Sequence, residues 1–416
     1  MKPITTDKDI MQKTIKQSSK LEDVCYDIRG PALEEAKSLE AQGHKILKLN
    51  IGNPALFGFS APNKVLNNVS ENLRLAQGYS DSKGLLSARQ AILEEYKTLG
   101  VSNIESNDIY LGNGVSELIT MAMQALLNNE DEVLVPMPDY PIWTASVRLS
   151  GGNPVHYICD EESDWYPAIS DIESKINSRT RAIVIINPNN PTGSVYNKRI
   201  LLDLVSLARK YNLILFADEI YSQIVYDEAE YFPLASLSED VFTVSFNGLS
   251  KSFRLAGFRS GWMIVSGPKH LAESYIEGLE ILSNMRLCAN VPGQYAVQTA
   301  LSNHQSIKEL TLPGGRLKNQ RDVTWKLLNQ IPGVSCVKPM GAIYLFPKLN
   351  PMIFRIEDDT KLILDILQKQ KILLVEGSAF NIKDKQHFRI VFLPDEELLS
   401  QAITQIKTVL DYYEQR

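Results

Sequence analysis

Several apolar runs along the chain end in residues whose side chains can do chemistry. The run at residues 213–217 ends in Asp218, and Tyr221 follows within one turn. The run at 183–186 leads into Asn-Pro-Asn-Asn-Pro-Thr-Gly at 187–193, a stiff turn that would hold the amide of Asn190 in place. Ligands of open α/β sheets bind outside the carboxyl ends of the strands, so both runs indicate a ligand site. Taken alone, such an Asp can simply cap a turn, and an Asn/Pro/Gly cluster is more often a plain turn.

A third run is followed by the pattern of an anion site. Residues 109–112 lead through a glycine turn to Val115 and Ser116, where a helical pattern begins. Free N–H groups and the helix dipole at such an N-terminus bind anions. The segment does not match the nucleotide patterns GxGxxG or GxxxxGK[ST], and many helices begin with Ser for capping alone.

A fourth run, at 241–246, is followed by Ser250 and Lys251, and then by Arg259. A lysine just past a buried strand can have a lowered pKa and form a Schiff base. An arginine can bind a phosphate through two parallel hydrogen bonds. Most single lysines are solvated surface charges, so Lys251 alone would be weak evidence.

Together these groups match the needs of pyridoxal phosphate. Its aldehyde needs a lysine, its ring nitrogen an anion, its phenolic oxygen hydrogen-bond donors, and its phosphate cations and N–H groups. The strand ends offer each of these.

The elements that must position these residues have the pattern of an α/β fold. Apolar runs of three to six residues, rich in β-branched and aromatic side chains, alternate with helical patterns such as 117–127 and 198–210. The runs are residues 109–111, 133–135, 155–158, 182–186, 213–217, 241–246 and 262–265. Runs that are apolar on both faces are typical of a buried, mostly parallel sheet flanked by helices.

The pattern changes after about residue 300 and predicts a smaller α+β domain. A long helix at about 306–330 precedes a hairpin of 334–338 with 342–346, and then helix, strand (372–375), strand (388–392) and a closing helix. We expect three parts. They are an N-terminal arm with part of the small domain (1–60), a large cofactor-binding domain (61–303) and a C-terminal small domain (304–416).

Composition excludes several other classes. The chain has 416 residues and a net charge of -6, which weighs against nucleic acid as the main ligand. The four cysteines are far apart, with no metal-ligand spacing, so we expect no metal site and a reducing compartment. No stretch reaches the roughly 18 apolar residues of a membrane span, and residues 1–20 lack the apolar core of a signal peptide. These features predict a cytoplasmic protein that does not bind membranes.

Over residues 20–412 the sequence resembles the class I and II aminotransferases, the fold type I enzymes of pyridoxal phosphate. The run at 187–193, Asp-Glu-Ile-Tyr at 218–221 and Ser-Lys-x7-Arg-x-Gly at 250–261 carry the resemblance. Within the family it is most similar to bacterial glutamate–pyruvate (alanine) aminotransferases, through residues 21–30, 247–251 and 285–290. This resemblance implies a large domain with a mostly parallel sheet, a smaller α+β domain and a homodimer with shared active sites.

The resemblance also implies roles for individual residues. Lys251 would be the catalytic residue, binding the cofactor as a Schiff base and later moving the proton at the substrate Cα. Asp218 would pair with the pyridinium nitrogen. The other cofactor contacts implied are Tyr221 and Asn190 at the phenolic oxygen, Val115, Ser116, Ser250 and Arg259 at the phosphate, Tyr140 on the ring, and Tyr79 from the second subunit.

For the substrate, the resemblance implies that Arg389 binds the α-carboxylate, with Gly52 leaving room for it and Asn190 nearby. Tyr26, on an arm that also carries Arg29, would reach the substrate or simply pack. One position departs from many relatives, which have Ser where this chain has Gly248, three residues before Lys251. The resemblance therefore implies no side-chain contact with the phosphate at Gly248, while Ser250 and Arg259 keep theirs.

The function implied is amino transfer between L-alanine and 2-oxoglutarate in two half-reactions. No second arginine motif is evident, so we expect a movable arm or water, rather than a fixed arginine, to accommodate the glutamate side chain. Two alternatives stay open. One is another donor specificity or a β-lyase with the same cofactor, and the other is a non-catalytic cofactor-binding regulator.

Overall fold

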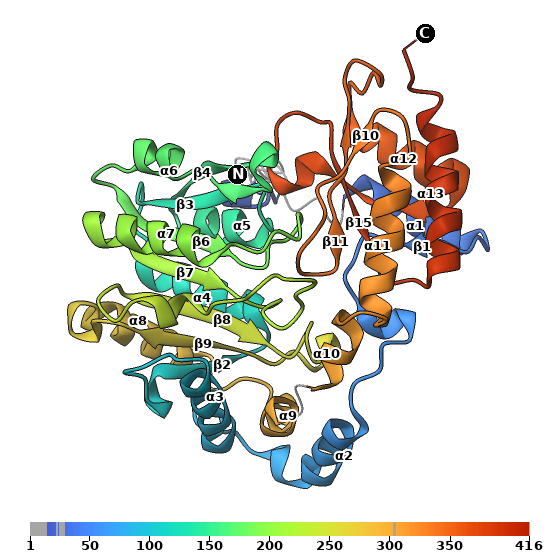
Figure 1. Ribbon diagram of the computed structural model, residues 1–416. Coiled ribbons are helices and arrows are strands. Elements are labelled where there is room, and N and C mark those ends of the chain that lie inside the picture. Colours follow the sequence, from blue (N-terminus) through green and yellow to red (C-terminus); the bar gives the residue numbers. More distant parts are fainter. Residues whose placement is uncertain (1–14, 22–23, 25–29, 303–304, 416) are drawn as a thin grey trace, which may run out of the picture.

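The computed structural model describes residues 15–21, 24, 30–302 and 305–415. An eight-stranded sheet forms its centre, with strand order β2-β9-β8-β7-β6-β3-β4-β5 (Figure 1). The strands are β2 (Ile109–Gly112), β3 (Glu132–Met137), β4 (Asn153–Asp160), β5 (Tyr166–Pro167), β6 (Thr180–Ile186), β7 (Ile214–Asp218), β8 (Thr243–Gly248) and β9 (Gly261–Ser266). Every strand predicted from an apolar run in this region is present, and the mostly parallel sheet is confirmed.

Strand direction decides which groups meet. Strands β4, β3, β6, β7 and β8 run parallel, and β9 is antiparallel to both β8 and β2. The carboxyl ends of β2, β6, β7 and β8 therefore lie at one edge of the sheet, and β9 begins there. Gly261 of β9 pairs with both Gly112 and Gly248 at that edge.

Both faces of the sheet are covered, because alternate residues of each buried strand point to opposite sides. In β6, Val184 packs in one core with α4 and α8, while Ile183 and Ile185 pack in another core with α7. The helices on the first face are α4 (Val115–Leu126), α5 (Ile142–Leu149) and α8 (Glu273–Met285). Those of the other face and the adjoining edge are α2 (Asn63–Asn72), α3 (Leu86–Thr98), α6 (Ile169–Lys175), α7 (Lys198–Tyr211) and α9 (Val291–Leu301).

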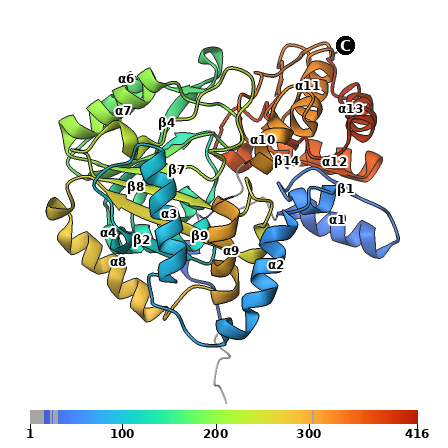
Figure 2. The same cartoon turned by 60° about the horizontal axis from the view of Figure 1, so that its bottom comes forward.

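A separate core joins the N-terminal segment to the C-terminal part of the chain. Strand β1 (Leu47–Lys48) pairs in parallel with β13 (Ile372–Leu373), and α1 (Pro31–Ala41) packs on α12 (Asp359–Gln370). Figures 1 and 2 show the blue N-terminal segment against the red C-terminal lobe. The remaining elements there are α10 (Gln305–Thr311), β10 (Val334–Ser335), β11 (Tyr344–Leu345), β12 (Lys348–Leu349), β14 (Val375–Glu376), β15 (Phe388–Val391) and α13 (Glu396–Leu410). The expected packing of the N-terminal segment with the smaller lobe is confirmed, while the domain boundaries at 60 and 303 stay a proposal.

Two details predicted for this lobe were wrong. The long helix at 306–330 is two helices, α10 and α11 (Arg316–Leu328). Pro313, Gly314 and Gly315 separate them, and Gly314 has φ +83°, which a helix cannot continue through. The hairpin of 334–338 with 342–346 does not form, because β10 pairs with β12, and β11 pairs with β15. The partner strand thus lies farther along the chain than the local pattern indicated.

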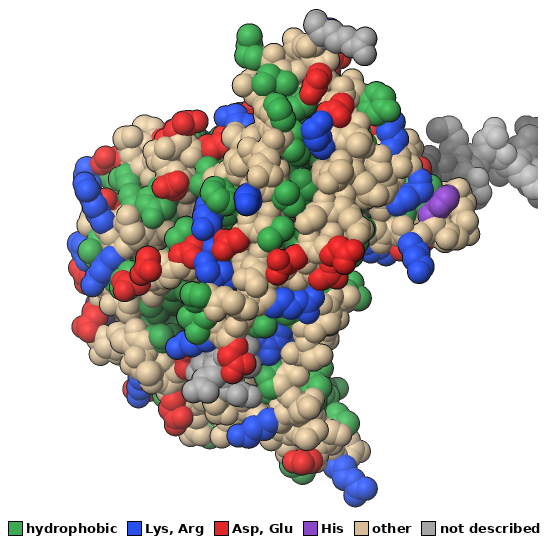
Figure 3. Space-filling view, turned by 45° about the vertical axis from the view of Figure 1, so that its right-hand side comes forward, with side chains coloured by type: hydrophobic (Ala, Val, Ile, Leu, Met, Phe, Trp, Pro, Cys, Tyr) green, Lys and Arg blue, Asp and Glu red, His purple; other side chains and the backbone are tan. Residues whose placement is uncertain are grey.

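The surface has no face of a single charge in the view of Figure 3, where acidic and basic side chains are interspersed. Among the described residues, no helix is long and apolar enough to cross a membrane. Nor do the described side chains include a cluster of three or more that could hold a metal ion.

Candidate active site

A cavity of about 440 Å³ lies between the carboxyl ends of the strands and the smaller lobe, because residues of both line it. Most residues predicted to bind cofactor or substrate line it. They are Gly52, Val115, Ser116, Tyr140, Asn190, Asp218, Tyr221, Ser250, Lys251, Arg259 and Arg389. Tyr79 is not among them, and Tyr26 and Arg29 lie outside the described residues.

Lys251 follows β8 and projects its amine into this cavity. Its Nζ donates a hydrogen bond to the backbone oxygen of Gly52, at 2.8 Å, and lies 5.9 Å from the centre of the Tyr221 ring. None of the ion pairs between described residues involves Lys251. An amine held by a neutral carbonyl is available for covalent chemistry, which is the role that the sequence analysis expects of Lys251.

Asp218, the last residue of β7, is fully buried at the floor of the cavity. Its Oδ2 accepts a hydrogen bond from the indole N–H of Trp143, at 3.0 Å, and its Oδ1 accepts a longer one from the backbone of Ile220. It therefore caps the turn as well as facing the cavity. Burial raises the pKa of Asp218 to about 6, although Trp143, Ile220 and the nearby Lys251 lower it. A buried carboxylate with so few donors is suited to a cationic ligand group.

A pH effect on the cofactor-free protein follows from this burial. Because the folded-state pKa is above the ordinary value, stability decreases as pH rises from about 4 through about 6. We expect Asp218→Asn to remove this decrease, so that relative to wild type the variant gains ~1–3 kcal/mol of unfolding free energy between pH 5 and pH 7.5. Urea unfolding of both cofactor-free proteins at the two pH values measures this. If the unfolding free energies of wild type and variant differed by the same amount at both pH values, the folded state would not raise the pKa of Asp218.

The phosphate end of the predicted site is the N-terminus of α4. Val115 is its first residue, so the first N–H groups of the helix are free of intrahelical bonds. Arg259 reaches this turn, where its Nη2 donates to the backbone oxygen of Asn113, at 3.2 Å. Glu117 accepts from the backbone and side chain of Asn113 and from Arg286, at 2.6–2.9 Å, and so fixes the turn. The arrangement combines free N–H groups with a guanidinium, which is the donor set a phosphate needs.

Gly114 tests this arrangement. It has φ +87°, and a Cβ there would lie 2.3 Å from Arg259 Nη2. We expect Gly114→Ala to push Arg259 aside and weaken the binding of pyridoxal phosphate at least ~10-fold, besides a strain cost of ~1–3 kcal/mol. Gly43→Ala is the matched control, because Gly43 has φ +91° and no atom within 4 Å of the added Cβ. Titration of the cofactor-free proteins with pyridoxal phosphate should separate them. Equal affinity in the two variants would mean that the turn does not hold the phosphate.

Arg389, on β15, enters the cavity from the smaller lobe and is 2% exposed. Its Nη1 donates to Asn190 Oδ1, at 2.9 Å, and its Nη2 donates to the backbone oxygen of Asn50. The rings of Tyr344 and Phe380 lie 4.4 and 4.7 Å from its Cζ. Its Nε has no hydrogen-bond partner among the described residues. A buried guanidinium that forms no ion pair with a described carboxylate is suited to a carboxylate ligand.

Tyr221 and Tyr344 form a pair beside this arginine, with their hydroxyl oxygens 2.6 Å apart. Burial raises the pKa of Tyr221 well above its usual value, and Tyr344 raises it further, so the hydroxyl stays protonated and can donate. The close packing also explains Gly52, since a Cβ there would lie 2.5 Å from Tyr344 Oη.

Sequence reasoning missed three contributors. Trp143 supplies the N–H to Asp218, Tyr344 lines the cavity beside Tyr221, and Asn50 binds Arg389 through its backbone. Trp143 carried a usable signal, because a buried tryptophan needs a partner for its N–H. Tyr344 and Asn50 come from segments that only the tertiary structure brings to the cavity.

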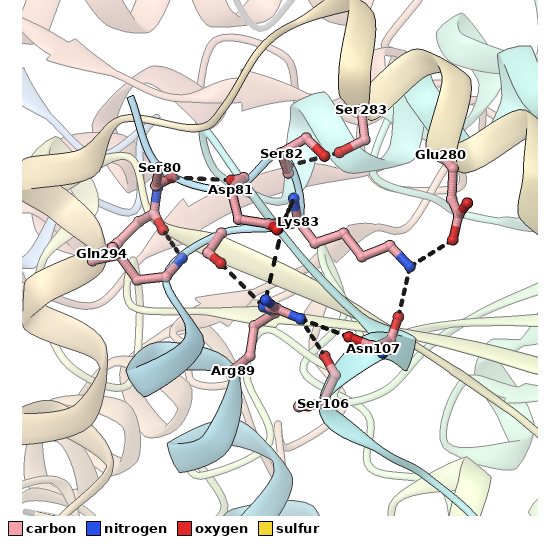
Figure 4. A network of polar contacts seen from close by, with 12 residues as sticks. Ser80, Asp81, Ser82, Lys83, Arg89, Ser106, Asn107, Glu280, Ser283 and Gln294 are labelled. Atoms are coloured by element: carbon pink, nitrogen blue, oxygen red, sulfur yellow. Dashed lines mark hydrogen bonds and ion pairs between the residues drawn. The ribbon is translucent and has the colours of Figure 1, made fainter. Parts of the chain in front are cut away.

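Tyr79 is 81% exposed, away from the cavity of its own chain. The segment after it is held firmly, as Figure 4 shows. Lys83 Nζ bonds Glu280, at 2.6 Å, and Ser82 O accepts from Ser283 and Arg286. Arg89 donates to the backbone oxygens of Gly84 and Ser106. Tyr79 is thus exposed on a segment that is well anchored. Its role in the site of a second subunit remains a prediction.

The fold and this site define a class of protein. The chain belongs to the class I and II aminotransferases, whose family model matches residues 44–406. This family depends on pyridoxal phosphate. The chain is 59% identical over 401 residues to glutamate-pyruvate aminotransferase AlaA of Escherichia coli (strain K12), covering 96% of this chain and 99% of that protein. It is 55% identical over 405 residues to an alanine aminotransferase of Mycobacterium tuberculosis (strain H37Rv), covering 97% and 94%. A crystal structure of an aminotransferase from Escherichia coli has a TM-score of 0.95 and 59% identity, covering 97% of this chain and all of that one.

Proposed function

We propose that this chain is a glutamate–pyruvate (alanine) aminotransferase, which moves the amino group of L-alanine to 2-oxoglutarate and so forms pyruvate and L-glutamate. The names of the relatives that match it over nearly their full length support this donor and acceptor. The observation that carries the proposal is that Lys251, buried Asp218 and buried Arg389 face one cavity.

The residues present fit pyridoxal phosphate. Asp218 is a buried carboxylate for the ring nitrogen, and Tyr221 is a protonated donor for the phenolic oxygen, together with Asn190. Arg259, Ser250 and the first N–H groups of α4 suit the phosphate, and Tyr140 supplies an aromatic face. When bound, the cofactor supplies an electron-accepting ring that stabilises negative charge at the substrate Cα.

The chain's own groups account for the rest of the reaction. Arg389 binds the α-carboxylate that alanine, glutamate and both oxo acids share, and so orients Cα. Lys251 would hold the cofactor through its amine, and the same amine, when free, would take and return the Cα proton as general base and acid. Asp218 would bind the ring nitrogen of the cofactor and favour its protonated form. No fixed partner for a second carboxylate is needed for alanine, and a movable group or water would accommodate that of glutamate.

Donor specificity tests this proposal directly. The purified enzyme, loaded with pyridoxal phosphate, is mixed with single L-amino acids, and its visible absorption band is followed. L-Alanine should bleach the band and form pyruvate in an amount equal to the bleached cofactor. L-Glutamate should likewise bleach it and form 2-oxoglutarate. After alanine, added 2-oxoglutarate should restore the band. A band that responds to another amino acid but not to alanine would overturn the donor. Release of pyruvate with ammonia from a β-substituted amino acid, without transfer, would indicate a β-lyase.

We further propose a homodimer with shared active sites. Large apolar side chains are exposed on and near the Tyr79 segment, and the backbone contacts of Ser82 tie this segment to the end of α8. They are Leu73, Leu75, Tyr79, Met285 and Leu287, each more than half exposed. Several large apolar side chains exposed on neighbouring segments are typical of an interface.

A hybrid experiment tests the sharing. If Tyr79 acts in the partner's site, a Tyr79→Ala subunit paired with a Lys251→Ala subunit has one site with both residues intact. Mixed and refolded subunits should then regain about a quarter of wild-type activity, because half of the random dimers are hybrids with one intact site. Activity no greater than the average of the separate variants would place Tyr79 outside the partner's site.

A further inference from the structure

A second cavity, of about 870 Å³, lies behind the turns that carry the catalytic groups. It is larger than the 440 Å³ of the candidate active site, and the two cavities share no lining residue. Its walls come from the end of α3, the turn after β7, the segment around α10, and β8 and β9. Protein interiors contain few voids larger than a water molecule, and this volume is within the range of ~300–1,000 Å³ that small-molecule sites have.

Most of the wall is apolar. The contributing side chains include Leu99, Phe253, Leu301, Ile307 and Leu312. Phe253, Leu301 and Ile307 are at most 6% exposed, whereas Leu312 is 58% exposed and lies at the outer end. A wall of this kind favours a ligand with an aromatic or branched apolar body.

The deep end carries two buried polar groups, from Tyr96 and Trp262, whose hydrogen bonding is incomplete among the described residues. The hydroxyl of Tyr96 and the indole N–H of Trp262 are buried and have no hydrogen-bond partner of normal geometry among the described residues. The two groups lie close together, because Trp262 interacts with the Tyr96 hydroxyl. Burial raises the pKa of Tyr96 above its usual value, and Trp262 and Asn247, facing its hydroxyl, lower it. Buried donors are nearly always paired, so this pair is suited to an acceptor atom supplied by a ligand or by water.

The charges around the cavity do not favour an anion. Glu95, Asp227 and Glu228 line it with Lys308 and Lys318. Lys318 is already paired with Asp227 and lies 3.3 Å from Asp322. The described lining residues therefore offer an anion no surplus of positive charge, whereas a neutral ligand does not need one.

We propose that this cavity is a second ligand site, which binds a neutral small molecule with an aromatic or branched apolar body and one hydrogen-bond acceptor placed at Tyr96 and Trp262. The site lies directly behind the catalytic turns. Ser222 follows Tyr221 in the chain, Phe253 is two residues from Lys251, and Asn247 of β8 donates to Ser222 Oγ, at 3.0 Å. A ligand here would press on the turns of the active site without entering it.

Fluorine NMR of the holoenzyme with 4-fluoro-N,N-dimethylbenzamide tests the proposal. This probe is neutral, carries an acceptor and no donor, and should bind with a Kd of ~1 mM, as expected for its size. Tyr96→Phe removes the donor and should raise the Kd at least ~3-fold. Tyr110→Phe is the matched control, because the Tyr110 hydroxyl is also buried without a hydrogen-bond partner but does not line the cavity. Val225→Trp, at a partly exposed position in the wall, should fill the cavity and abolish binding.

Further outcomes decide the matter. Saturating L-alanine and 2-oxoglutarate should not displace the probe, and 4-fluorobenzoate should bind at least ~10-fold more weakly at this site. Displacement by the substrates would assign the probe to the active site and overturn the proposal. No binding at 10-fold above the expected ~1 mM would show that the cavity holds water only. If Tyr96→Phe bound the probe as tightly as wild type, the acceptor of the ligand would not lie at the Tyr96 hydroxyl, and the proposal would be contradicted.

Discussion

Lys251→Ala is expected to lower kcat at least ~10⁴-fold, because it removes both the amine that carries the cofactor and the base that moves the Cα proton. Within the described part of the chain, this amine donates its hydrogen bond to a backbone carbonyl, and it shares the cavity with buried Asp218. Lys251→Arg keeps the positive charge but cannot form a Schiff base, so it should be almost as inactive. Steady-state pyruvate formation measures the loss, and the absorption spectrum shows whether the covalently bound cofactor band has disappeared.

Lys175→Ala is the matched control for this loss. Lys175 is also partly buried, and its Nζ binds the His156 carbonyl, at 2.7 Å, and Asp171, at 2.6 Å, away from the cavity. It should retain activity within ~3-fold of wild type, in line with a partly exposed ion pair. If Lys251→Ala kept more than a tenth of wild-type activity while correctly folded, Lys251 could not be the catalytic base. If the chain were a non-catalytic regulator, wild type and Lys251→Ala would show the same negligible turnover.

Arg389→Lys is expected to lower kcat/KM by ~10²–10³-fold, mainly through KM. Two of the arginine's nitrogens already bind Asn190 and Asn50, and its stacked position between Tyr344 and Phe380 holds the guanidinium plane still. A lysine keeps the charge but loses the planar fork. Because the α-carboxylate is common to both substrates, the loss should be similar for L-alanine and for 2-oxoglutarate.

The decisive measurement is whether Arg389→Lys loses the same factor in kcat/KM for L-alanine as for 2-oxoglutarate. Arg321→Lys is the control, because Arg321 is also fully buried, but it binds Asp227 and Asp322 outside the cavity. It should cost stability and leave both KM values within ~3-fold of wild type. A loss at Arg389 confined to 2-oxoglutarate would mean that this arginine binds the distal carboxylate instead, and the proposed orientation of the substrate would be wrong.

That Asp218 and Lys251 line one cavity could be predicted because the strands that carry them are parallel. Asp218 and Lys251 each follow an apolar run, and the carboxyl ends of parallel strands meet at one edge whatever the loops between them do. Local pattern and chain direction are therefore sufficient to bring these side chains together. The phosphate turn before α4 is equally local, because its glycine, hydroxyl and helix start are consecutive in sequence.

The sequence pattern failed where partners come from distant segments. Residues 334–346 alternate like a hairpin, but β11 pairs with β15, because the edge of β15 is available and buries Tyr344 against Tyr221. The helix break before α11 was visible as Pro-Gly-Gly but was overridden by the apolar periodicity on both sides.

By itself the sequence determined the sheet, the side chains that stand at the ends of its strands and, through family resemblance, the family of enzymes. Only the tertiary structure decided how Arg389 binds Asn190, 199 residues away, and that Trp143 reaches Asp218, 75 residues away. It also decided that a second cavity forms behind the catalytic turns. The physical reason is that strand and helix patterns depend on neighbouring residues, whereas the pairing of buried polar groups depends on which surfaces pack together. That packing is set by the whole core, which no short stretch of sequence contains.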